Sequence, residues 1–91
     1  MKVFRWSEEK NSLLRDERGV SFEEVIIALS EDGPLKTLEH SNQKKYPHQK
    51  IFVIVLDQYA YLVPFVETES EIFLKTIIPS RKATKQYLED K

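Results

Sequence analysis

The chain has 91 residues, no cysteine, and 14 basic against 15 acidic side chains, so its formal net charge is −1. This length fits one small domain, and the absence of cysteine excludes disulfide bridges, a thiol nucleophile and thiolate metal ligands. The longest apolar run, Ile51–Leu56, is far shorter than the roughly 20 residues of a membrane helix. Met1–Trp6 leads into charged residues, unlike a signal peptide. We therefore expect a single cytoplasmic domain over residues 1–91.

The near-neutral total hides an uneven distribution of charge along the chain. Residues 1–33 carry five basic and eight acidic side chains, whereas residues 34–66 carry four basic and two acidic ones. Two segments, 40–50 and 75–88, contain basic residues and no acid. Two interpretations fit this pattern. One is a basic face that binds an anion, and the other is a solvated surface on which charged side chains are unevenly distributed.

The first third of the chain predicts two helices. Ser7 is a suitable N-cap for the first helix, and Gly19 is a suitable C-terminal stop. Ser21 and Glu24 form a capping box that begins the second helix, which ends at residues 32–34. Apolar side chains follow this cap at helical spacing: Phe22, Val25, Ile26 and Leu29.

The middle of the chain has the pattern of strands, which we expect at residues 35–40, 51–56, 59–66 and 72–78. Asp57 and Gln58 form a two-residue turn between the second and third of these, and Pro64 predicts an edge or a bulge. Residues 3–6 are either a short strand or a lead-in. A C-terminal helix begins at Ser80 and runs to about Asp90. The order predicts an α+β fold, in which two N-terminal helices and the C-terminal helix pack on a four-stranded antiparallel meander.

The segment from the last strand into the last helix carries the strongest candidate site. Arg81 and Lys82 occupy the first helical turn, where the helix macrodipole favours acids over cations. A bound anion would compensate for this, because unpaired backbone N–H groups, an arginine fork and a lysine together form a phosphate-sized receptor. Alternatively, both cations point into solvent or pair with the acidic residues near the chain end.

Aromatic residues and histidines supply further candidates. If Ile72, Leu74, Thr76 and Ile78 face the core, then Phe73, Lys75 and Ile77 share the other face of the fourth strand. A base stacked on Phe73 beside the lysine is one interpretation, and an ordinary exposed sheet face is the other. His40 and His48 flank a basic loop without metal-ligand spacing, so no metal site is expected.

Three segments in combination resemble the BrnT family of type II toxin–antitoxin systems. They are Phe4-x-Trp6-x-x-x-Lys10-Asn11, Arg18–Glu24 and Ile77–Lys85, and together they run in register over nearly the whole chain. The resemblance implies a RelE-like fold and a metal-independent endoribonuclease that inhibits translation. It also implies a cognate DNA-binding antitoxin, encoded nearby, which covers the toxin in a hetero-oligomer.

The chemistry that the resemblance implies needs an activated 2′-OH, a stabilised phosphate and a protonated leaving oxygen. Arg81 is the candidate for stabilising the phosphate, Lys75 is a second cation, and His48 or Tyr87 moves the protons. Further contacts to RNA phosphates are expected from Ser80, Lys82, Lys85, Lys44 and Lys45. No cofactor is expected.

The alternative function is a non-catalytic protein-binding module that retains the fold and the partner docking without RNA cleavage. Members of the family usually carry extra arginines on the strands before the last helix. The comparable positions here are Glu67, Leu74 and Thr76.

Overall fold

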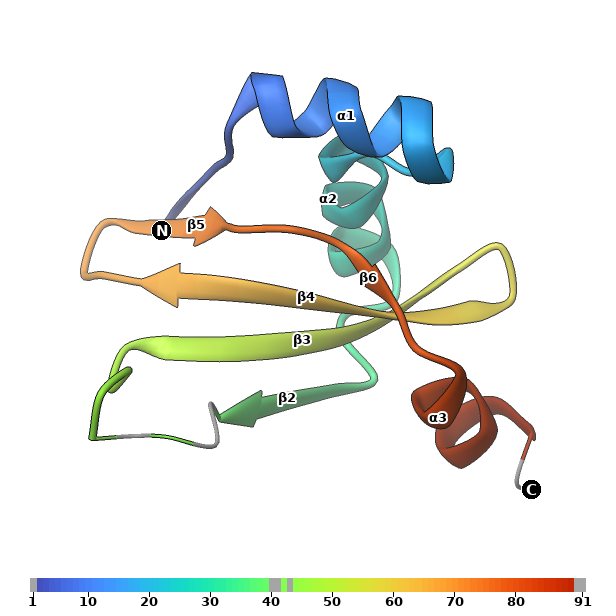
Figure 1. Cartoon of the computed structure of the whole chain (residues 1–91). Coiled ribbons are helices and arrows are strands. Elements are labelled where there is room, and N and C mark those ends of the chain that lie inside the picture. The colour runs from blue at the N-terminus through green and yellow to red at the C-terminus, as the bar shows by residue number, and fades with distance from the viewer. Residues whose placement is uncertain (1, 40–41, 43, 90–91) are drawn as a thin grey trace.

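The computed structural model describes residues 2–39, 42 and 44–89, which form an α+β fold (Figure 1). The helices are α1 (Glu8–Arg18), α2 (Phe22–Glu31) and α3 (Arg81–Thr84), which continues into the π-helical turn η1 (Lys85–Glu89). The strands are β1 (Val3–Arg5), β2 (Lys36–Glu39), β3 (Gln49–Leu56), β4 (Tyr59–Glu67), β5 (Glu71–Leu74) and β6 (Ile78–Pro79).

The two N-terminal helices begin and end where the sequence predicts. Ser7 caps α1 by accepting the N–H of Lys10, and Gly19 ends this helix in the left-handed conformation, with φ of 68°. Ser21 caps α2 by accepting the N–H of Glu24, and the Ser21 hydroxyl lies 3.2 Å from the Glu24 carboxylate. Both helix predictions are therefore confirmed.

Asn11 joins the two helices from a fully buried position. Its amide oxygen accepts the N–H of Phe22 at 2.8 Å, and its amide nitrogen donates to Glu23 at 2.8 Å. Arg15 donates to the same carboxylate at 3.0 Å. The Asn11 hydrogen bond is the main reason why the pKa of Glu23 lies below its usual value.

The sheet is mixed rather than wholly antiparallel, and it has six strands in the order β1-β5-β4-β3-β2, with β6 also paired to β4. The strands β2 to β5 pair antiparallel in succession, as predicted, but β1 pairs in parallel with β5. The predicted four-stranded antiparallel meander is therefore wrong at this edge. The three residues of β1 are too few to predict a partner, and this partner, β5, lies far away in the sequence.

The turn between β3 and β4 has the backbone that the two-residue spacing predicts. Asp57 and Gln58 both have positive φ, of 53° and 65°, as a type I′ turn requires. Neither is glycine, so the left-handed conformation costs about 1 kcal/mol or more at each. The ladder between β3 and β4 offsets this cost, because it pairs Gln49 to Leu56 without interruption.

A break at residues 75–77 divides the predicted fourth strand into β5 and β6. The N–H of Lys75 donates to the carbonyl of Pro64 at 2.8 Å, and Arg18 of α1 donates to the carbonyl of Ile77 at 2.6 Å. The break shifts the alternation of faces, so Ile77 is fully buried and Ile78 is 38% exposed. The predicted faces of these two isoleucines are therefore wrong. Pro64 lies opposite the break, in agreement with the bulge that it predicts.

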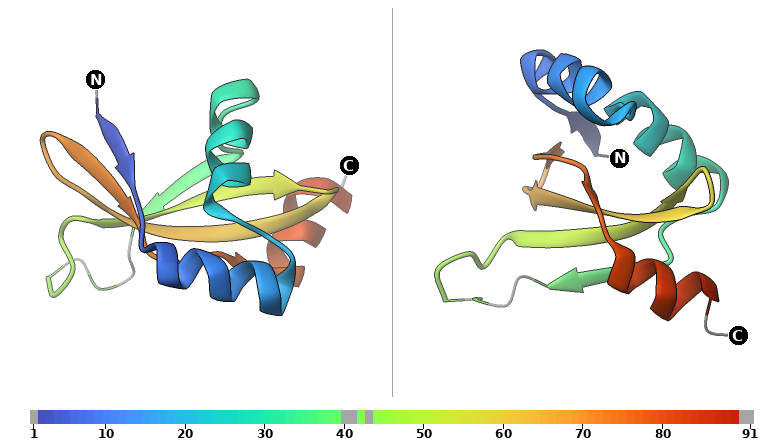
Figure 2. Two further views of the ribbon diagram at one scale, coloured as in Figure 1. Left: turned by 90° about the horizontal axis from the view of Figure 1, so that it is seen from above. Right: turned by 45° about the vertical axis from the view of Figure 1, so that its right-hand side comes forward.

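The sheet separates two layers of helices (Figures 1 and 2). The main core lies beneath α1 and α2, and its largest buried side chains are Leu14, Phe22, Ile54, Phe65, Leu74 and Ile77. A smaller cluster lies on the opposite face, where Ala83, Tyr87 and Leu88 of α3 and η1 contact Val53 and Ala60. The sheet therefore holds the candidate cations of α3 away from the N-terminal helices.

Candidate nucleic-acid interface

Hydrogen bonds join the start of α3 to one residue of β4, Ala60. The N–H of Ser80 donates to the carbonyl of Ala60 at 3.0 Å, and the N–H of Ala60 donates to Thr84 Oγ1 at 2.9 Å. The Thr84 hydroxyl donates in turn to the carbonyl of Ser80 at 2.8 Å, and Thr84 is only 5% exposed. Ala60 pairs with Val55 of β3 on one side, and Ser80 and Thr84 take the place of a neighbouring strand on its other side. The sequence interpretation missed Thr84, although a threonine four residues after an N-cap can form this bond back to the cap.

Ser80 has a structural role at the predicted phosphate site. Its side-chain oxygen accepts the N–H of Ala83 at 3.0 Å, which confirms the predicted N-cap. This bond already satisfies one of the N–H groups that the sequence interpretation offered to a phosphate. The charged side chains that follow, rather than the backbone alone, are therefore the stronger anion-binding groups.

Four cations lie along the chain between the break after β5 and the first residue of η1. Lys75, Arg81, Lys82 and Lys85 are all exposed. Within the part of the chain that the structure describes, none of them forms an ion pair. We call these four side chains the α3 cations.

The helical layers differ in charge as well as in position. Residues 8–32, which include α1 and α2, carry eight acidic and three basic side chains, whereas the rest of the chain carries seven acidic and eleven basic ones. Since α3 packs on the opposite face of the sheet from α1 and α2, the acidic excess lies away from the α3 cations. An anionic ligand would be attracted to the α3 side and repelled from the other.

Phe73 lies on the sheet face opposite α1 and α2, since its neighbours Ile72 and Leu74 belong to the main core. It is 37% exposed and pairs across the sheet with Val66. Lys75 follows two residues later and is also exposed. An aromatic ring and a cation are therefore near neighbours along the chain, but Ile77 is in the core and does not share this surface.

His48 lies at the other end of the sheet from Arg81. The N–H of Glu67 donates to the carbonyl of His48 at 3.1 Å, whereas Ser80 bonds to Ala60, seven residues earlier on the same strand. At about 3.3 Å per residue, these two positions are roughly 23 Å apart. The structure does not bring His48 together with Arg81 as the proposed chemistry requires.

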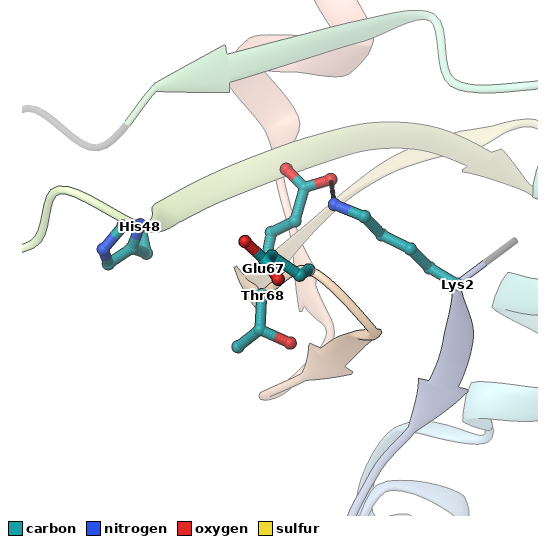
Figure 3. A pocket seen from close by; sticks show the side chains of 5 residues that line it. Lys2, His48, Glu67 and Thr68 are labelled. Carbon is teal, nitrogen blue, oxygen red and sulfur yellow. Dashed lines mark hydrogen bonds and ion pairs between the residues drawn. The ribbon is translucent and has the colours of Figure 1, made fainter.

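His48 instead borders an open hollow of about 420 Å³ (Figure 3). Lys2 and Glu67 also line it, and the Lys2 amine donates to the Glu67 carboxylate at 2.6 Å. Lys50 donates to the other oxygen of the same carboxylate at 3.3 Å. The hydrogen bond from Lys2 first, and then that from Lys50, hold the pKa of Glu67 below its usual value. Lys2 and Lys50 are therefore already paired at this end of the sheet.

Lys44 and Lys45 belong to the loop that leads into His48 and β3, so they lie toward the His48 end. Both are exposed, and the Lys45 amine lies 5.5 Å from the centre of the Tyr46 ring. The predicted loop also contains His40, which is outside the described residues. The structure therefore divides the predicted phosphate contacts into two groups at different ends of the sheet.

Tyr87 is on the same short helical segment as Arg81, but its ring packs in the smaller apolar cluster with Val53 and Ala60. It is half-buried. Packing is therefore an established role of this side chain, and a role in proton transfer stays a prediction.

No protein-family model, no curated protein and no solved structure matches this chain. The family resemblance therefore depends on the motif residues alone. Among the described residues, no group of three or more His, Asp or Glu side chains forms a candidate metal site. No helix among them is long and apolar enough to cross a membrane.

Proposed function

We propose that this protein is the RelE-like toxin component of a type II toxin–antitoxin module and that it cleaves RNA in the cytoplasm without a metal ion. The observation that carries the proposal is the set of four exposed α3 cations, which form no ion pair with a described residue and lie away from the acidic helices. Three of them belong to the segment that most resembles the BrnT family. A cognate DNA-binding antitoxin is the proposed partner.

Arg81 is the proposed phosphate-stabilising group in this mechanism. Its guanidinium can donate two parallel hydrogen bonds to the non-bridging oxygens of the scissile phosphate, whose negative charge grows as the 2′-oxygen attacks. Lys82 and Lys85 would hold the flanking phosphates, and a base would stack on Phe73 near Lys75. Lys44 and Lys45 would contact RNA only if the strand extends toward the His48 end.

Proton transfer in this mechanism has two candidate residues. Of the two candidates, Tyr87 shares a helical segment with Arg81, whereas His48 is roughly 23 Å away along the strand. This separation favours the second candidate function, a protein-binding module that keeps the fold and the partner without cleaving RNA.

An RNA-cleavage assay in EDTA tests the proposal. The purified protein should cleave a labelled RNA, and Arg81→Ala should reduce the rate more than tenfold, which corresponds to about 1.4 kcal/mol of barrier. Lys10→Ala is the matched control, because Lys10 is a basic residue of α1 that forms no ion pair with a described residue. An equal rate for Arg81→Ala and the wild type would refute the assignment of Arg81.

Induction in cells separates the two candidate functions. The toxin should arrest growth when it is expressed alone, and co-expression of the neighbouring gene should restore growth. Stable complex formation with the neighbour, without growth arrest or cleavage of RNA, would instead establish the non-catalytic module.

A further inference from the structure

Two adjoining hollows lie where the C-terminal end of α2 meets the end of β3. Their volumes are about 300 and 220 Å³, and Ala28, Asp32 and Val55 line both of them. We call the continuous depression formed by both hollows the α2 groove. It shares no residue with the α3 cations or with the hollow beside His48.

Apolar side chains flank the α2 groove and remain in contact with water. Leu35 lines the first hollow and is 45% exposed, and Ile27 lines the second and is 54% exposed. Single exposed apolar residues are common on protein surfaces. Here two large ones lie on either side of the shared residues Ala28 and Val55, so a partner could bury all four together.

The charged residues of the α2 groove all have one sign. Four acids line it, at Glu24, Glu31, Asp32 and Asp57, and its described lining contains no lysine, arginine or histidine. Two of these acids are unfavourably placed, because Glu31 and Asp32 lie at the C-terminal end of α2, where the macrodipole favours cations. No basic residue in the last turn of α2 compensates for them. A cation supplied from outside would interact favourably with both the carboxylates and the helix end.

We propose that the α2 groove is the docking site for a basic amphipathic segment of a partner protein. Two or three apolar side chains of this segment would cover Ile27, Val55 and Leu35, and flanking lysines or arginines would pair with the rim carboxylates. The same carboxylates would repel RNA phosphates. The proposal is therefore independent of the α3 cations and of RNA cleavage.

An NMR titration of the isotope-labelled full chain tests the proposal. The probe is a 12-residue amphipathic peptide of leucine and lysine, and two matched peptides replace either its lysines by glutamate or its leucines by serine. The original peptide should shift the amide resonances of Ile27, Ala28, Leu35 and Val55. Each matched peptide should bind at least tenfold more weakly, because it lacks either the positive charge or the apolar side chains.

A pair of charge-reversal variants locates the binding site. Glu31→Lys with Asp32→Lys should weaken binding of the original peptide at least tenfold, and it should preserve the fold, because lysines are favourable at a helix C-terminus. Asp16→Lys with Glu17→Lys is the control, since it changes the net charge equally at exposed positions of α1. The control should change the affinity by less than threefold.

Four outcomes would overturn the proposal. If the control variant weakens peptide binding as much as the groove variant does, binding depends only on net charge. If the serine peptide binds as tightly as the original peptide, the apolar side chains do not contribute to binding. Concentration-dependent shifts at the same amides without peptide would identify a second copy of this chain as the occupant. Shifts of these amide resonances on addition of an RNA oligonucleotide would show that the α2 groove binds nucleic acid and not a basic protein segment.

Discussion

The two ends of β4 both gather basic side chains, but they use them differently. At the Glu67 end, one carboxylate accepts hydrogen bonds from Lys2 and Lys50. At the Ala60 end, Ser80 and Thr84 satisfy the backbone, and the cations beside them, including Arg81, pair with no described residue. Lys2 and Lys50 at the first end therefore contribute to the fold, whereas the cations at the second end are available to an external anion.

The ion pairs at the Glu67 end and the hydrogen bonds at the Ala60 end of β4 also differ in their exposure to solvent. The Glu67 side chain is 29% exposed, so water and salt weaken its ion pairs. Thr84 is 5% exposed, and its hydroxyl joins the Ala60 N–H through a buried hydrogen bond and the Ser80 carbonyl through a partly buried one. The hydrogen bonds near Ala60 should therefore contribute more to stability than the ion pairs of Glu67, even though they involve no charge.

The largest expected effect comes from Thr84→Val. This change keeps the shape of the side chain but leaves the buried Ala60 N–H without its partner, whereas the Ser80 carbonyl still accepts the backbone N–H of Thr84. An unsatisfied buried N–H costs about 1–3 kcal/mol, so the free energy of unfolding should fall by about 2 kcal/mol. The free energy of unfolding can be measured by urea denaturation, with circular dichroism as the probe.

Thr84→Ser is the matched control for this prediction, because it retains the hydroxyl and removes only a methyl group. It should cost about 1 kcal/mol or less. A loss of stability that is larger for the serine variant than for the valine variant would mean that packing, and not hydrogen bonding, holds α3 to β4.

Nucleic-acid binding should show the next largest difference between the two ends. The triple variant Arg81→Ala, Lys82→Ala and Lys85→Ala should weaken binding of a single-stranded RNA at least tenfold. It should also lower the slope of log affinity against log salt by about 2, because each phosphate contact to a single strand contributes about 0.7. Fluorescence anisotropy at several salt concentrations measures both quantities.

Lys2→Ala with Lys50→Ala provides the comparison from the other end of β4. It removes two cations that Glu67 already neutralises, so the salt slope should stay nearly unchanged. If this double variant lowers the slope as much as the triple variant does, RNA binds along the whole sheet and the distinction between the two ends fails.

The sequence predicted the features that depend on neighbouring residues. Ser7, Ser21 and Ser80 each cap a helix, and the Asp57–Gln58 turn has the expected backbone, because a few adjacent residues determine these structures. Candidate cations on the last helix were also recognisable from their unfavourable position in its first turn.

The features that the sequence could not predict depend on contacts between distant segments. The parallel pairing of β1 with β5 joins residues almost 70 positions apart, as Val3 with Glu71 illustrates. The break before β6 depends on Pro64 and Arg18, neither of which is adjacent to it in sequence. His48 and Arg81 were expected in one site because both have suitable chemistry, but only the register along β4 shows how far apart they lie.

The smallest expected effect concerns the pH dependence of Glu67. Lys2 and Lys50 lower the pKa of its carboxyl from the usual value near 4.5, so the ionised form stabilises the fold. That stability is fully present above the pKa of the unfolded chain and is lost as the pH falls through the lower pKa of the folded protein. Glu67→Gln should therefore lower the free energy of unfolding by at most about 1 kcal/mol at pH 7, since the pairs are partly exposed.

The difference between Glu67→Gln and the wild type should shrink as the pH falls below about 4.5, which urea unfolding at a series of pH values measures. Added salt should shrink it as well, because screening weakens partly exposed ion pairs. The stability change caused by Thr84→Val should respond to neither pH nor salt, since no charged group takes part in its hydrogen bonds. A Glu67 effect that persisted unchanged at low pH would show that its side chain stabilises this end of the sheet by packing, and the electrostatic contrast between the two ends of β4 would then not hold.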